Sequence, residues 1–195
     1  MEPCKDTLKK HCENKRCHFY IGVRPCDKEA DKIEATLHFI REQLLYDVAN
    51  LGYVEGDVMT EDAPHPRHQT QDIIQEGSVD RVTRVLDLAH ADCVEALYNY
   101  TKRDVEESDM DDTLSEPEEY VIRLFLPKDF SQTTLNLIAK SVHEYLVACV
   151  MADWLSITNP PASTKWSERS KPLLDAIKNK MNHRNSITRR RMSPF

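Results

Sequence analysis

The sequence predicts a mainly α-helical protein, a bundle of about four helices with one or two short β-strands. Three observations lead to this class. The 195 residues include only four glycines, 30% are charged, and the ten prolines gather in a few places, which favours helices with definite breaks. Apolar residues also recur at steps of three and four along several stretches. The length suits one domain or two small ones with a real core.

The stretch 119–158 is apolar enough to form the centre of that core. Alternating apolar residues from Tyr120 to Leu126 predict a short strand, which Pro127 ends. A central helix is predicted next, apolar all round from Tyr145 to Ala152 and stopped by the run 159–161. Its core scaffold, spaced along one helical face, is Leu135, Ile138, Val142, Leu146, Cys149, Val150 and Trp154.

Residues 1–26 are expected to form a cysteine-rich arm and a strand, HFYIGVRP. The arm raises the possibility of zinc, but structural zinc sites usually space cysteine ligands two to four residues apart, and the gaps here are seven, four and eight residues. We therefore predict no metal site from the available ligands, which are Cys4, His11, Cys12, Cys17, His18 and Cys26.

Residues 27–103 are expected to form a first helical half. Apolar residues from Ala30 to Leu51 predict one helix over 27–51, ended by Gly52. The polar residues 60–77 predict a loop with at most one helical turn, in which the histidines at 65 and 68 are solvated. Ser78 is placed as the N-cap of a further helix that runs to about Lys102.

Residues 104–119 carry nine acidic residues and no basic one, which predicts a solvated linker. Close carboxylates at Asp109, Asp111 and Glu116 suggest calcium, but the glycine and ligand spacing of an EF-hand are missing. The second half, 120–184, adds a last helix from Ser163 to about His183, which Pro172 either kinks or begins.

The two halves resemble each other as strand–proline–helix–helix units about 102 residues apart. If the duplication is real, strands 18–24 and 120–126 would pair beside a four-helix core. Coincidence remains the alternative, because identity between the halves is weak.

No catalytic signature is present, so we expect no enzyme and no cofactor. His143 falls one residue off the inward stripe and is expected to be a flanking polar residue. Asp153 is expected on the exposed side of its helix or bonded to the next loop, because unpaired buried charge is rare. The cysteines are expected to be reduced, with Cys93 and Cys149 on buried helix faces.

No N-terminal apolar leader follows Met1, and the longest apolar run is shorter than the roughly 20 residues that span a bilayer. We therefore expect a soluble protein that makes no membrane contact and is not secreted.

Charge is polarised along the chain. Residues 165–195 hold nine Lys and Arg against Glu168 and Asp175, a net +7, whereas residues 1–164 carry −14. The basic end of the chain, 185–195, lacks the interleaved aromatics of a nucleic-acid binder. We interpret it as an arm that orders on a protein partner, with contact residues Arg184, Arg189, Arg190, Arg191, Met192 and Phe195.

The helix ending in ADWLSITNPP, the helix from Trp166 and the arm RRRMSPF resemble head-to-tail connector proteins (adaptor or neck proteins) of tailed bacteriophages, of the type found in phages and prophages of gut Bacteroidetes. The resemblance covers residues 119–195 and reaches the N-terminal half only in its helical layout. It implies a virion protein, assembled in the bacterial cytoplasm, that forms a ring of about twelve subunits under the portal.

The same resemblance implies that the arm docks on the portal protein or a neighbouring subunit. An acidic surface would then face the channel and let DNA slide past. Two alternatives stay open: a tail terminator or tail-completion protein, a class usually dominated by sheet, and a host cytoplasmic regulator that uses the Cys/His arm as a metal site.

Overall fold

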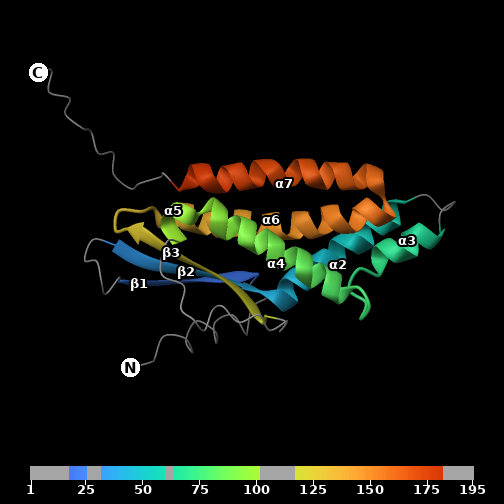
Figure 1. The fold of residues 1–195 in the computed structure, drawn as a ribbon, viewed down its shortest axis with the longest axis horizontal. Helices are drawn as coiled ribbons and strands as arrows, with labels where there is room; N and C mark the ends of the chain where they lie inside the picture. The colour runs from blue at the N-terminus through green and yellow to red at the C-terminus, as the bar shows by residue number, and fades with distance from the viewer. Residues whose placement is uncertain (1–17, 26–31, 60–63, 102–116, 182–195) are drawn as a thin grey trace, which may run out of the picture.

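The computed structural model describes residues 18–25, 32–59, 64–101 and 117–181. A three-stranded antiparallel sheet lies at one end of a helical assembly (Figure 1). Its strands are β1 (Phe19–Pro25), β2 (Lys32–Ile40) and β3 (Glu119–Pro127), in the order β1-β2-β3. Within the described residues the chain is therefore mainly helical with a small sheet, as the sequence predicts at this level.

Six helices occur in the described residues, and Figure 1 shows the long helix α6 between α7 and the sheet. Helix α6 also contacts α2, α3 and α4, so it is packed on several sides. The bounds are α2 (Arg41–Val58), α3 (Pro64–Gln71), α4 (Val79–Ala96), α5 (Tyr98–Thr101), α6 (Gln132–Thr158) and α7 (Pro160–Lys180).

The sheet turns one face to the helices because its apolar side chains alternate along each strand. On β2 the residues Ala35, Leu37 and Phe39 are buried. Phe39 lies opposite Phe19 on β1 and Tyr120 on β3, so the same face is apolar across all three strands. This register fixes which side of the sheet the central helix covers.

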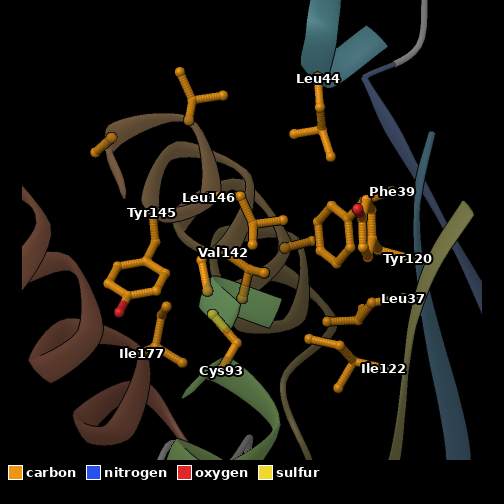
Figure 2. Close-up of a cluster of buried hydrophobic side chains, with 14 of the residues drawn as sticks. Leu37, Phe39, Leu44, Cys93, Tyr120, Ile122, Val142, Tyr145, Leu146 and Ile177 are labelled. Atoms are coloured by element: carbon orange, nitrogen blue, oxygen red, sulfur yellow. The ribbon is translucent and has the colours of Figure 1, made fainter. Parts of the chain in front are cut away.

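The core lies between the sheet and α6. Figure 2 shows Phe39 and Tyr120 directed from the sheet toward Leu146, and Ile177 of α7 on the opposite side of the same helix. The predicted scaffold residues of α6 are buried except Cys149 and Trp154, which are partly buried against the core. Helix α6 is long and apolar enough to cross a membrane by length and composition, but 67% of its most apolar window is buried in the protein, as expected of a core helix.

The predicted helix over 27–51 is wrong in its first part. Residues Lys32–Ile40 form strand β2, and helix α2 begins only at Arg41. The apolar positions 33, 37 and 40 fit a helical face, but 33, 35, 37 and 39 fit an alternating strand equally well. Pairing with strands on both sides decides the ambiguity in favour of the strand, because each neighbour satisfies one row of its backbone groups.

The expected pairing of the two sequence-predicted strands is also wrong. Both strands exist, as β1 and β3, but β2 lies between them and pairs with each. The first half therefore begins with two strands where the second has one, so the strand–helix–helix order is not repeated as predicted.

Gly52 does not end its helix. Helix α2 continues to Val58, and both Gly52 and Gly56 are buried where α3 crosses. A Cβ on Gly52 would lie 3.0 Å from the carbonyl oxygen of Thr70 and 3.1 Å from Cγ2 of Ile73. The glycine is therefore explained by close approach of the next segment rather than by a helix cap.

Other element boundaries differ from the prediction. Part of the expected loop forms α3, and the last helix begins at Pro160, whose fixed φ suits a first turn. Pro172 lies inside α7. Ser78 does precede α4, but its side chain makes no capping hydrogen bond, and α4 ends at Ala96.

Several predictions fall outside the described residues. These are the cysteine-rich arm at 1–17, the carboxylates of the acidic linker between 102 and 116, and the basic arm after Met181.

Candidate functional site

Two histidines from distant segments meet at one carboxylate. Asp47 of α2 accepts a hydrogen bond at Oδ2 from His18 Nδ1 at 2.8 Å and another from His143 Nε2 at 2.9 Å. His18 directly precedes β1, and His143 lies in the middle of α6. The three ligand-capable atoms lie within 4.8 Å of one another, and no other such group of three was found among the described residues.

The group borders an open pocket of about 540 Å³ between β1, α2, α6 and α7. Exposure falls across the group, because the side chain of His18 is 48% exposed, Asp47 20% and His143 8%. The group therefore extends from the surface to the edge of the core. The pocket is lined by His18, Phe19, Asp47, Asn50, Leu51, Lys140, His143, Glu144, Val147 and Arg169.

The protonation of His143 follows from its surroundings. Burial lowers the pKa of His143, and the hydrogen bond to Asp47 opposes this shift without cancelling it. The ring is therefore neutral at pH 7 and donates from Nε2 to the carboxylate. Its other nitrogen, Nδ1, is buried and has no hydrogen-bond partner in the described part of the chain.

The two histidine rings are also held by aromatic contacts. Their centroids are 5.3 Å apart and nearly perpendicular, and Phe19 lies 6.4 Å from His143. The other oxygen of Asp47 accepts a hydrogen bond from Gln43 Nε2 at 3.3 Å, one turn earlier on α2. These contacts orient the three groups before any ligand is bound.

Across the pocket, Arg169 of α7 donates to Glu144 at 2.8 Å. Both side chains are about half exposed, so this ion pair adds at most about 1 kcal/mol to stability. With Asp47 and Lys140, the pocket carries two positive and two negative charges.

A second histidine–carboxylate group lies elsewhere on the sheet. Glu119 Oε2 accepts from Tyr20 at 2.8 Å and is 3.1 Å from His38 Nδ1. The rings of Tyr20 and His38 stack at 4.3 Å. A single histidine contributes here, so the group offers fewer metal ligands than the one at Asp47.

The thiols of Cys93 and Cys149, on α4 and α6, are poor nucleophiles. Burial raises the pKa of Cys93 far above its usual value and that of Cys149 to about 11. Tyr145, whose hydroxyl donates to Asp92 at 3.1 Å, also has a raised pKa because of burial. We infer a packing role for this group.

Asp153 forms a two-bond ion pair with Arg81 of α4, at 2.7 and 3.0 Å. Both side chains are partly exposed, which fits the prediction that this carboxylate lies toward the exposed side of its helix. A smaller pocket of about 260 Å³ lies beside it, lined by polar residues from 69 to 78 and by the end of α6.

Sequence reasoning missed most of the candidate site. His143 was predicted to be a flanking polar residue and is buried, because α6 is covered on several sides and not only along one stripe. His18 was considered only with the N-terminal cysteines, and Asp47 was not singled out. The one available signal was a histidine amid the apolar residues of the central helix.

Comparisons with protein-family models, curated proteins and solved structures find no match to the chain.

Proposed function

We propose that the protein is a structural subunit of a tailed-bacteriophage neck, which forms a ring between portal and tail. The proposal rests on the resemblance of residues 119–195 to head-to-tail connector proteins. It assigns no catalytic role to the chain and places it in the virion. The observation that supports it best is an exposed apolar face on helix α2.

That face carries large apolar side chains that a single subunit leaves in water. Tyr53 is 60% exposed, Val54 51% and Val58 79%, and Tyr46, about two to three turns earlier, is 52% exposed. They lie on the half of α2 opposite Leu44, Val48, Gly52 and Gly56, which face the protein. Such a cluster is typical of a protein–protein contact.

A second copy of the chain is the occupant that the charges favour. The C-terminal residues 165–195 carry +7 and the rest of the chain −14, so unlike ends of neighbouring copies attract. Contact between unlike surfaces is head-to-tail, and head-to-tail contacts that close form a ring. In this arrangement, the basic arm at 185–195 reaches the portal or the next subunit, and the acidic remainder faces the DNA.

The test is the mass of the purified full chain, by native mass spectrometry and analytical ultracentrifugation. We expect a closed oligomer of about twelve subunits, and that Tyr53→Gln and Val58→Gln shift it toward monomer. Leu88→Gln is the matched control, because Leu88 is 69% exposed on a different helix. A monomer at every concentration would overturn the proposal, and equal loss in the control would overturn the role of α2.

The arm has a separate test. Removing residues 185–195 should leave the circular dichroism spectrum unchanged and abolish entry into particles, because the arm supplies Arg forks and Phe195 to the partner. Truncated protein that still enters particles would refute the role of the arm. A spectrum dominated by sheet would favour the tail-terminator alternative. The described residues are mainly helical, which favours a neck protein over that sheet-rich class.

A further inference from the structure

We propose that His18 Nδ1, Asp47 Oδ2 and His143 Nε2 bind one divalent transition-metal ion, with Zn²⁺ as the probe, and that the ion fastens β1 to helices α2 and α6. This inference is independent of the proposed neck function. It departs from the sequence-based expectation of no metal site.

The types of ligand atom determine the class of metal. Two imidazole nitrogens and one carboxylate oxygen suit zinc and its neighbours among the transition metals, whereas Ca²⁺ and Mg²⁺ prefer oxygen alone. Three protein ligands are the number found in zinc sites that keep one position for water. The pocket of about 540 Å³ beside the three residues gives water access to that position.

The distances are close to those that a metal requires. In a tetrahedral zinc site with bonds of about 2.0–2.2 Å, neighbouring ligand atoms lie roughly 3.3 Å apart. The nitrogens of His18 and His143 lie 2.8 and 2.9 Å from Asp47 Oδ2, and the three atoms are within 4.8 Å of one another. Lengthening each nitrogen–oxygen distance by about half an ångström would make room for the ion. The side chain of His18 is about half exposed and is able to move by that amount.

His143 is the most buried of the three residues. Its side chain is 8% exposed, and its Nε2 lies 2.9 Å from Asp47 Oδ2. Its Nδ1 has no hydrogen-bond partner among the described residues. Metal binding requires the neutral ring with its proton on Nδ1 instead of Nε2. Nδ1 accepts no hydrogen bond from the residues that the structure describes, so the proton moves there without breaking one at that atom.

The site would act as a clamp. β1 is an edge strand of the sheet, and His18 stands directly before it. Asp47 lies on α2, and His143 lies on α6, which contacts β1. An ion bound by all three residues therefore joins segments that are 29 and 96 residues apart along the chain, and it stabilises only the folded state.

The test uses the full chain, freed of metal, with Zn²⁺ affinity measured at pH 7.5 by competition with a chromophoric chelator. The N-terminal thiols are removed first by Cys→Ser substitutions at 4, 12, 17 and 26, so that they bind no zinc. We expect one ion per chain and a higher Tm with zinc. Mg²⁺ and Ca²⁺ should change neither quantity.

In the same background, His18→Ala, Asp47→Asn and His143→Gln should each weaken binding by more than about 100-fold, because outer-shell partners alone contribute about 10- to 100-fold. His38→Gln is the matched control, since it removes a histidine beside a carboxylate on the same sheet. It should leave zinc affinity within about twofold of the parent, well below the loss of even an outer-shell partner.

Two outcomes overturn the proposal: no zinc binding by the chain that lacks its four N-terminal cysteines, or unchanged affinity in Asp47→Asn. Should His143→Gln fail to fold, His18→Ala decides the question, because His18 is about half exposed and its loss leaves the core intact. Cobalt in place of zinc should give visible d–d absorption bands that disappear in His18→Ala.

Discussion

The contact between α2 and α3 is tested by enlarging Gly52. Replacing it by Ala adds a Cβ that would lie 3.0 Å from the Thr70 carbonyl oxygen and 3.1 Å from Ile73 Cγ2. The first neighbour is backbone and the second belongs to a fully buried side chain, so neither moves aside cheaply. Replacing Gly52 by Leu adds three further carbons to the same space.

Two effects oppose each other. Overpacking a well-packed contact costs about 1–3 kcal/mol, whereas replacing glycine inside a helix by Ala or Leu gains about 1 kcal/mol. Gly52→Ala should therefore lower the free energy of unfolding by about 0–2 kcal/mol. Gly52→Leu has nearly the same propensity gain and a much larger overlap, so it should lose more than about 3 kcal/mol.

The assay is urea unfolding followed by far-UV circular dichroism and by the fluorescence of Trp154 and Trp166. Gly22→Ala is the control, because no atom of the described residues lies within 4 Å of a Cβ built there. It should be neutral or stabilising. A Gly52→Leu variant as stable as the parent would refute the close contact with α3.

Three further predictions concern the core and its ionisable groups. Protonation of His143 should destabilise the fold as pH falls below about 6.5, because its pKa in the folded state lies below the ordinary 6.5 and the unfolded chain binds the proton first. Chemical denaturation at pH 7.5 and at pH 5.5 should show a loss of unfolding free energy at the lower pH, and this loss should be smaller in His143→Gln. Leu146→Ala should lower the free energy of unfolding by about 2–5 kcal/mol, because the side chain is fully buried. Asp153→Asn should lower it by at most about 1 kcal/mol, since the ion pair of Asp153 is partly exposed. Similar losses in the two variants would contradict the argument from burial. The pKa of Cys149 is raised to about 11, so its alkylation at pH 8 should be more than about 100-fold slower in the folded protein than in urea. Peptide mapping after an iodoacetamide pulse measures both rates. Equal rates would show that the thiol is accessible and ionised in the folded protein.

The sequence predicted the elements whose pattern had a single interpretation. Strand β3 and helix α6 lie where the sequence placed them, because the alternation from Tyr120 to Leu126 fits a strand and the three-four spacing from Leu135 to Trp154 fits a helix. Strand β2 was missed because residues 33 to 40 fit both periods, and only pairing on both edges selects the strand. Gly52 was misread because a glycine at a cap and a glycine at a helix crossing look alike in sequence.

The candidate metal group was beyond sequence reasoning for a different reason. His18, Asp47 and His143 are separated by 29 and 96 residues, so no local spacing links them. Their meeting depends on where the start of β1 lies relative to α2 and α6, which the pattern within each element does not specify.

By itself, the sequence determined that a mainly helical chain is built around 119–158, because the periodicity and density of apolar residues are local properties. Tertiary structure decided the order of the strands, the burial of His143 and the convergence of two imidazoles on Asp47. Those features arise from contacts between segments far apart in the chain, and such contacts depend on how the elements pack and not on the pattern within any one of them.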